Sequence, residues 1–171
     1  MTSLESGRYR FILNGDGREE LYELVNDPAE EHNVADIAVF ARASSDAGAD
    51  ALSCINTLLG LAVDVETRKP KLAFGTGGLS GPAIRPVAVR MAFEAARAVR
   101  IPVIGIGGIS SAEDALEFLI AGCRAVQVGT ANFVDPEVHL RILEGLEAYL
   151  ARHGMESLDQ VIGTLDFPVR R

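Results

Sequence analysis

The sequence predicts an α/β fold that corresponds to the C-terminal portion of a (β/α)8 barrel and is preceded by a β-hairpin. Residues 101–130 follow the order strand, glycine turn, helix, strand and glycine turn, which is one βαβ unit. Both strands are short apolar runs without polar alternation, as in a parallel sheet that is buried on both faces. The glycine turns leave backbone N–H groups free at the strand ends, and in eight-stranded barrels a phosphate site commonly follows strands 7 and 8.

The first half of this central unit is defined by its turn and capping signals. Its strand, Val103 to Ile106, runs directly into Gly107 and Gly108, where the absence of a Cβ lets the backbone turn tightly and approach a ligand. Ser111 and Asp114 have the spacing of a capping box and predict the start of a helix. One face of that helix is expected to be apolar and buried: Ala112, Ala115, Leu116, Leu119 and Ile120.

A second glycine corner closes the unit. Gly122 is expected to end the helix, and a further apolar strand, Ala125 to Val128, ends in Gly129 and Thr130. Two parallel strands that end in glycines place free N–H groups side by side. We therefore expect a cup for an anion such as a phosphate at this edge of the sheet.

Residues 1–32 have a different pattern and predict a β-hairpin, which we treat as a unit separate from residues 33–171. Apolar residues alternate between Arg8 and Leu13, and the run from Asn14 to Gly17 is a strong turn signal. Leu21 to Val25 is the expected return strand.

Ahead of the central unit, the sequence first predicts a helix over residues 37–47 and then a buried strand, Ala51 to Ile55. The strand is followed by Asn56 and Thr57. Because the C-terminal ends of barrel strands face the ligand, and an Asn side chain both donates and accepts hydrogen bonds, this pair suits a planar ring with carbonyl and N–H groups. The alternative is that the pair caps the following turn.

The segment from Gly60 to Pro82 is rich in glycine and has no clear period, so we expect an ordered, functional loop. Gly81, at its end, is a further position where the backbone could contact a cofactor. A helix is expected to begin near Pro86, which suits a first helical turn. Its predicted core face consists of Val87, Met91, Ala95 and Ala98.

The C-terminal region predicts one long helix, which begins after Asp135-Pro136 and ends at Gly154. A capping-box spacing from Ser157 to Gln160 predicts a further short helix, and the residues from Thr164 onward are expected to fray. The long helix should bury one face: Val138, Ile142, Leu146 and Leu150.

Length and composition limit the function. The 171 residues suit one domain but are short for a complete eight-fold barrel, which needs about 250 residues. A net charge of −8 without a Lys/Arg run argues against nucleic acid or an anionic membrane as partner, and no apolar stretch is long enough to span a bilayer. The two distant cysteines do not form a CxxC pair, which favours a reducing, cytoplasmic location.

Four motifs together resemble the dihydroorotate dehydrogenase family, and most closely its class 1B catalytic subunit: Asn56-Thr57, GTGGLSGPAIRP, GIGG and QVGTANF. The resemblance runs from about residue 33 to residue 163 and implies strands 6 to 8 of an FMN-binding (β/α)8 barrel. The family oxidises dihydroorotate to orotate in pyrimidine biosynthesis. Its class 1B members pair with an iron–sulfur, FAD-carrying subunit that passes electrons to NAD⁺. Residues 1–32, through ELYEL and NDP, instead resemble the C-terminal hairpin of the sulfatase family, without its active-site motif.

The resemblance also implies a role for individual residues. Asn56 and Thr57 would hydrogen-bond the dihydroorotate ring. Six positions would contact FMN, the last four of them around its phosphate: Ile55, Gly81, Gly107, Gly108, Gly129 and Thr130.

Other parts of the family's site are missing from this sequence. The family's catalytic cysteine lies in a region that this chain lacks, and Ala29 occupies the position expected for its flavin-binding lysine. Cys54 and Cys123 are expected to be small core residues, so we assign no catalytic residue and no metal site. Because three parallel strands cannot close a barrel, activity would need the missing half from another chain, in a homo-oligomer or a complementing complex.

Three hypotheses remain open from the sequence. The chain is part of a dihydroorotate dehydrogenase, or it is a catalytically inactive flavin- or phosphate-binding fragment or self-associating scaffold. A fragment of a tryptophan- or histidine-pathway barrel would share the glycine turns, but it gives no reason for Asn56-Thr57 together with GGLSGP.

Overall fold

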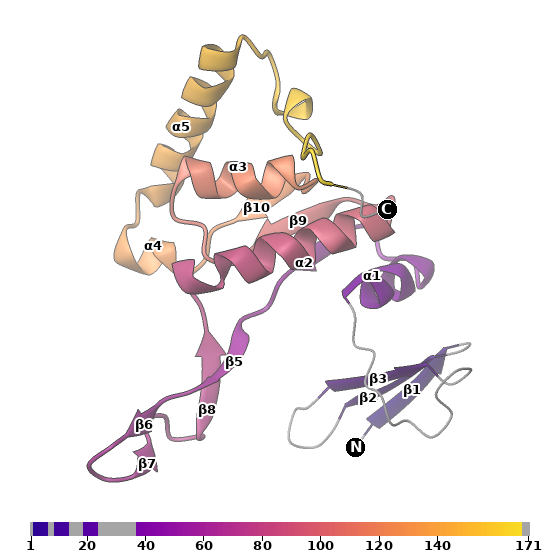
Figure 1. The fold of residues 1–171 in the computed structure, drawn as a ribbon, viewed down its shortest axis with the longest axis vertical. Coiled ribbons are helices and arrows are strands. Elements are labelled where there is room, and N and C mark those ends of the chain that lie inside the picture. Colours follow the sequence, from indigo (N-terminus) through magenta and orange to yellow (C-terminus); the bar gives the residue numbers. More distant parts are fainter. Residues whose placement is uncertain (1, 7–8, 14–18, 24–36, 169–171) are drawn as a thin grey trace.

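The computed structural model describes residues 2–6, 9–13, 19–23 and 37–168 (Figure 1). The order of elements in the later part alternates strands and helices, with a three-stranded parallel sheet at its centre. The strands are β4 (Leu52–Cys54), β9 (Val103–Ile106) and β10 (Ala125–Gln127), in the order β10-β9-β4. The predicted parallel α/β architecture is therefore present.

The strand β9 holds this sheet together because it pairs with both neighbours. Leu52 of β4 lies opposite Val103, and Ala125 of β10 lies opposite Ile104. The helices α2 (Arg85–Ala98) and α3 (Ala112–Ile120) lie side by side over one face of the sheet, where α2 contacts β9 and α3 contacts β10 (Figure 1).

The N-terminal strands form a separate antiparallel sheet of three strands: β1 (Thr2–Ser6), β2 (Tyr9–Leu13) and β3 (Glu19–Glu23). The predicted hairpin corresponds to β2 and β3, but β1 was not expected because TSLES has no apolar alternation. The predicted turn from Asn14 to Gly17 lies outside the described residues.

The helix α1 (Ile37–Asp46) packs against α2, and the core face of α2 differs from the prediction. Ala88, Ala92 and Ala95 are fully buried, whereas Val87 is exposed. Of the predicted face, Ala95 is buried and Met91 and Ala98 are half-buried against the core, so Val87 is the residue that was placed wrongly. Since α2 contacts α1, α3 and β9 at once, small side chains fill the closest contacts, and Met91 packs at their flank.

The helix α3 begins as the sequence predicts. The Ser111 hydroxyl accepts a hydrogen bond from the Asp114 N–H, and the Asp114 carboxylate accepts one from the Ser111 N–H, which completes the capping box. Phe118 of this helix is completely buried, with its ring against the backbone of Gly105 in β9. A Cβ at Gly105 would overlap this ring, so the glycine is required for close packing of helix on sheet.

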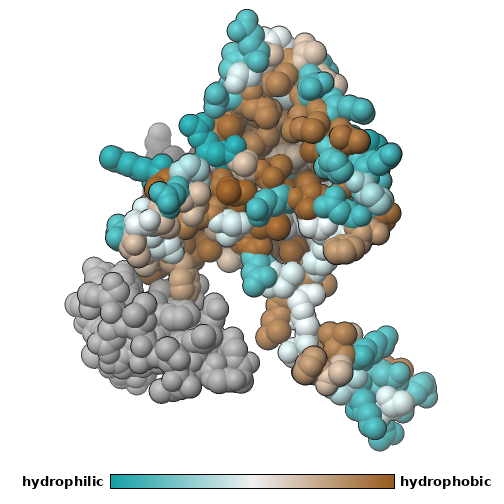
Figure 2. All heavy atoms as spheres, turned by 180° about the vertical axis from the view of Figure 1, so that it is seen from behind, coloured by the Kyte–Doolittle hydropathy of each residue, from teal (hydrophilic) through white to brown (hydrophobic). Residues whose placement is uncertain are grey.

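The glycine-rich segment between β4 and α2 is ordered, as predicted, but it forms an antiparallel arm rather than a loop. Its strands are β5 (Leu58–Leu61), β6 (Val63–Asp64), β7 (Lys69–Pro70) and β8 (Thr76–Leu79), with β5 paired to β8 and β6 to β7. Figure 1 shows the arm as a narrow projection from the body. It exposes large apolar side chains, among them Phe74 at 98% exposure, while hydrophilic atoms cover its tip (Figure 2).

The chain after β10 forms α4 (Ala131–Val134) and the long helix α5 (Val138–His153), which ends at Gly154 in a left-handed conformation. Val138, Ile142 and Leu146 are buried as predicted, and Leu150 is half-buried. A short 3₁₀ helix, η2 (Leu158–Gln160), begins with the predicted capping box.

The tail does not fray at Thr164, contrary to the prediction. The Leu165 N–H donates to the Ile120 carbonyl oxygen at 3.1 Å, and the Phe167 ring lies 4.9 Å from the ring of Phe93 on α2. Residues 164–168 are therefore held against α2 and α3, and the last three residues of the predicted tail lie outside the described residues. No helix within the described residues combines the length and apolar character needed to cross a bilayer.

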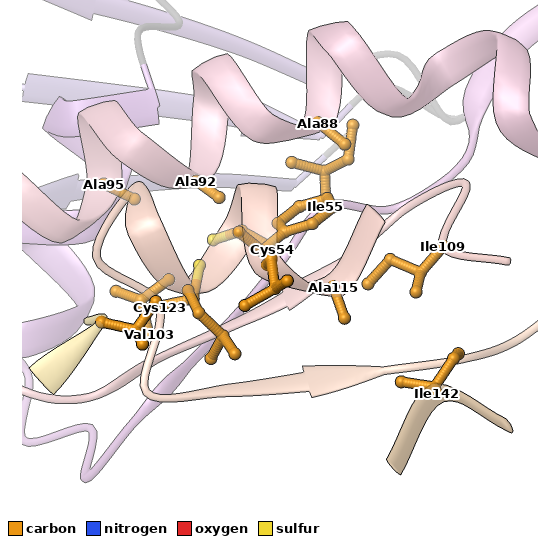
Figure 3. Packing of buried hydrophobic residues seen from close by; sticks show 14 of the residues in the cluster. Cys54, Ile55, Ala88, Ala92, Ala95, Val103, Ile109, Ala115, Cys123 and Ile142 are labelled. Carbon is orange, nitrogen blue, oxygen red and sulfur yellow. The ribbon is translucent and has the colours of Figure 1, made fainter. Parts of the chain in front are cut away.

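Cys54 and Cys123 lie in the hydrophobic core beneath the alanines of α2, as Figure 3 shows. Burial raises the pKa of the Cys54 thiol. Burial and, to a smaller extent, the neighbouring Cys54 raise the pKa of Cys123 to about 12. Both are small core residues in the thiol form, as predicted.

We expect both thiols to react slowly with iodoacetamide at pH 8 in the folded protein and rapidly in urea, because the thiolate is the nucleophile. The unfolded chain loses these protons near pH 9, whereas folded Cys123 keeps its proton to about pH 12. Stability should therefore fall as pH rises through this window. Mass spectrometry of the alkylated protein gives both rates, and equal rates with and without urea would contradict the buried position.

Candidate functional site

A pocket of about 580 Å³ lies where the carboxyl ends of the three parallel strands meet. Its size is within the usual range for small-molecule and cofactor sites. The walls come from four stretches of chain: the end of β4, the end of the arm with the following 3₁₀ helix η1 (Pro82–Ile84), the turn after β9, and the segment from the end of β10 to the start of α5. Such a crevice at the carboxyl ends of parallel strands is the usual ligand position in α/β proteins.

All eight residues to which the sequence analysis gave a role line this one pocket: Ile55, Asn56, Thr57, Gly81, Gly107, Gly108, Gly129 and Thr130. They come from four segments that are up to 75 residues apart in the sequence (130 − 55). The fold thus brings together positions that only their motifs connected. Their individual roles stay predictions.

The turn after β9 is tightly packed at its base. Gly107 and Gly108 have φ values of +139° and +77°, which L side chains rarely adopt. A Cβ on Gly107 would lie 2.6 Å from the Cβ of Ala88, and a Cβ on Gly108 would lie 2.6 Å from the Gly81 carbonyl oxygen. Glycine is therefore required at both positions, at Gly107 for the turn to pack against α2 and at Gly108 for it to reach the loop before α2.

The end of β4 supplies the polar pair. The Ile55 N–H donates to the Ile106 carbonyl oxygen at 2.9 Å, which fixes the strand end beside β9. The Asn56 side-chain oxygen accepts the Thr57 N–H at 2.8 Å, which is the local cap that the alternative interpretation foresaw. Since the Asn56 amide also carries two donor hydrogens, this cap is compatible with a contact to a ligand.

The turn after β10 is joined to the loop before α2. The Thr130 hydroxyl donates to the Ser80 hydroxyl at 2.9 Å, and the Asn132 amide donates to the Val128 carbonyl oxygen at 2.6 Å. A Cβ on Gly129 would meet nothing within 4 Å, so this part of the wall is open. The two glycine corners and the loop before α2 therefore surround one space.

Sequence reasoning missed several residues of the site. Ser80 and Ser110 line the pocket with hydroxyl groups, and Phe133 and Val134 add apolar surface, exposed by 92% and 86%. Ser80 lies inside the GTGGLSGPAIRP motif next to Gly81, and Ser110 follows the GIGG motif by two residues, so their positions near these motifs were the available signal. Phe133 ends the QVGTANF motif, so its position was likewise a signal, whereas Val134 had none because a four-residue helix gives no period.

The site holds neither cysteine and no cluster of metal-ligating side chains among the residues that the structure describes. Its polar groups are backbone N–H groups, hydroxyl groups, the Asn56 carboxamide and the Asp135 carboxylate, which is paired with Arg141, beside apolar walls. Such a set can bind an anion and a planar polar ring.

Comparisons with known proteins agree with this geometry. The family model for dihydroorotate dehydrogenase matches residues 31–150. The chain is 58% identical over 134 residues to a protein from Geobacter sp. (strain M21) named dihydroorotate dehydrogenase B (NAD(+)), catalytic subunit, and 60% identical to the protein of the same name from Trichlorobacter lovleyi. Each alignment covers 78% of this chain and 44% of the relative.

A solved structure gives the same result for the fold. The dihydroorotate dehydrogenase of Eimeria tenella, in complex with ferulenol, superposes with a TM-score of 0.62 at 25% identity, over 75% of this chain and 34% of that one. The chain spans less than half of the length of the relatives it matches. From the pocket, the family match and these relatives together, the chain belongs to the dihydroorotate dehydrogenase family.

Proposed function

We propose that this chain binds FMN in the pocket and supplies part of the site at which dihydroorotate is oxidised to orotate. The observation that carries the proposal is the convergence of both glycine corners and the Asn56-Thr57 pair on one pocket in a member of this family. In this proposal residues 33–171 form strands 6 to 8 of the barrel with their helices, and residues 1–32 form a separate sulfatase-like unit.

The residues present fit the phosphate end of FMN. The backbone at Gly108 is pressed against Gly81 so closely that no Cβ could be inserted, while the space over Gly129 is open to a ligand. The N–H groups of these corners, with the Thr130 hydroxyl, would hold the phosphate. Ile55 would contact the flavin ring from the apolar wall.

The substrate would lie beside this ring. Asn56 and Thr57 would orient dihydroorotate by hydrogen bonds to its carbonyl and N–H groups. FMN, when bound, supplies the electron-accepting ring. The base that removes the substrate proton would come from the part of the family fold that this chain does not span, in a complementing chain or an oligomer.

An electron-transfer subunit is a further partner in this proposal. The names of the bacterial relatives contain the words catalytic subunit and NAD(+). A complex with an iron–sulfur, FAD-carrying subunit would give this chain NAD(+) as its electron acceptor. The proposed place of this chemistry is the cytoplasm.

The test is flavin binding by the purified 171-residue chain. We expect it to bind FMN about tenfold or more tightly than riboflavin, because only FMN carries the phosphate, and a tenfold preference equals about 1.4 kcal/mol. Quenching of flavin fluorescence measures both dissociation constants. Equal affinities for the two flavins, or none for either, would contradict the proposal.

A second candidate function is flavin binding without turnover. It is favoured by the position of both cysteines in the core, outside the pocket lining. Dihydroorotate-dependent reduction of a dye by the FMN-loaded chain separates the two candidates. Reduction supports the dehydrogenase, whereas bound FMN without reduction supports the second candidate.

A further inference from the structure

We infer that Arg85 is a positioning residue for the phosphate end of the pocket: through Asp114 it holds the turn after β9 in the conformation in which its N–H groups face an anion. Arg85 begins α2, and Asp114 lies in the first turn of α3. The two side chains form an ion pair that joins the two helices beneath the glycine turn. The inference rests on the proposed function.

Asp114 connects Arg85 to the backbone that follows the glycine turn. One carboxylate oxygen pairs with the Arg85 guanidinium. The other oxygen accepts three hydrogen bonds, from the Ser110 N–H at 2.8 Å, the Ser110 hydroxyl at 2.9 Å and the Ser111 N–H at 3.0 Å. Within the part of the chain that the structure describes, Asp114 is the only charged residue that is buried, at 5% exposure. Its position therefore fixes the chain immediately after Gly108.

Arg85 also meets this turn through its own backbone. A Cβ on Gly108 would lie 3.0 Å from the Cβ of Arg85 and 3.1 Å from its backbone nitrogen. The Ile84 N–H donates to the Gly81 carbonyl oxygen at 3.1 Å, the same oxygen that lies beneath Gly108. The first turn of α2, the loop before it and the turn after β9 are thus packed as one unit.

The role of Arg85 is indirect because its side chain does not line the pocket. Its Nε lies 3.3 Å from a carboxylate oxygen of Glu117, so the guanidinium lies between two carboxylates of α3. Removal of the guanidinium would leave the buried Asp114 carboxylate without its cation, and a buried charge without its partner is strongly unfavourable. The carboxylate can regain solvation only if the turn moves, and such a movement would misplace the N–H groups of the turn.

The same helix offers a matched control. Arg90 pairs with Glu94 four residues later, and its side chain is 59% exposed, compared with 27% for Arg85. Both arginines form an ion pair from α2, but the Arg90 pair lies within one helix and does not contact the pocket. An exposed pair of this kind contributes little to stability.

The experiment measures the ratio of riboflavin and FMN dissociation constants for the full chain and for Arg85→Met and Arg90→Met. We expect Arg85→Met to lower the preference for FMN about tenfold, with a small change in riboflavin affinity, and Arg90→Met to keep the parent ratio. Partial unfolding lowers both affinities by the same factor, so it cancels in the ratio. A structural role alone would therefore leave the ratio unchanged.

Two further variants complete the test. Arg85→Gln is a second uncharged variant and replaces Arg85→Met if that variant does not fold. Arg85→Lys keeps the charge and should restore part of the preference, since a single ammonium group replaces the planar fork. If the parent chain prefers FMN and the uncharged variants keep this preference in full, the inference about Arg85 is wrong, but the proposed function is not contradicted. A parent without any preference would overturn the proposed function and the inference together.

Discussion

Gly108→Ala is expected to weaken FMN binding by at least about tenfold. At φ +77° an alanine is strained by about 1–3 kcal/mol, and its Cβ would also lie 2.6 Å from the Gly81 carbonyl oxygen. The turn can relieve this overlap only by moving away from the loop before α2, which opens the anion site. Titration of FMN into folded protein, with folding checked by circular dichroism, measures the effect.

Gly75→Ala is the matched control for this substitution. Gly75 lies in the arm and has a similar φ of +83°, but a Cβ there meets nothing within 4 Å. The two variants therefore share the backbone strain and differ in the overlap and in the distance from the pocket. We expect Gly75→Ala to keep FMN affinity within about twofold. A similar loss in both variants would contradict the assignment of Gly108 to the site.

Phe118→Ala is expected to lower the free energy of unfolding by about 3–5 kcal/mol, because a completely buried aromatic side chain leaves a cavity. This is a large share of the 5–15 kcal/mol that holds a typical domain together. Phe118 lies between α3 and the central strand β9, so the cavity would open where helix and sheet meet. Urea unfolding followed by circular dichroism measures the change.

Phe74→Ala removes the same side chain from the exposed arm, where Phe74 is 98% exposed. Surface substitutions of this kind change stability by no more than about 0.5 kcal/mol. Equal effects of the two substitutions would show that the core does not form around Phe118 in solution.

The parts of the fold that the sequence predicts correctly depend on short-range signals. The capping box at Ser111 and Asp114, the end of α3 at Gly122 and the strand β9 each follow from fewer than ten consecutive residues. Hydrogen bonds and backbone preferences of this kind are decided locally.

The parts of the fold that the sequence did not predict depend on contacts between elements that are far apart in the sequence. The buried face of α2 is set by contacts with three other elements, so Ala88 and Ala92 are inside although larger apolar residues were available. Glycines hid the pairing of β5 with β8 because they are poor strand formers. The Arg85–Asp114 pair joins two helices 29 residues apart, and no spacing rule connects such positions.

The difference between local signals and long-range contacts also applies to the site. Its glycine corners were visible because each follows an apolar strand, and their motifs supplied the family. The meeting of Ser80 with Thr130, 50 residues later, depends on how the whole sheet brings its ends together. Sequence therefore predicts the backbone groups that could hold an anion more readily than the side chains that keep them in place.

The strand order β10-β9-β4 has a consequence for synthesis of the protein. The strand β4 leaves the ribosome first, yet its partner β9 follows only after the arm and α2 have been made. Until then the nascent chain carries an unpaired strand and an arm rich in exposed apolar side chains. During translation from Leu52 to Ile106, the nascent chain therefore exposes the most apolar surface and unpaired strand for a chaperone to bind.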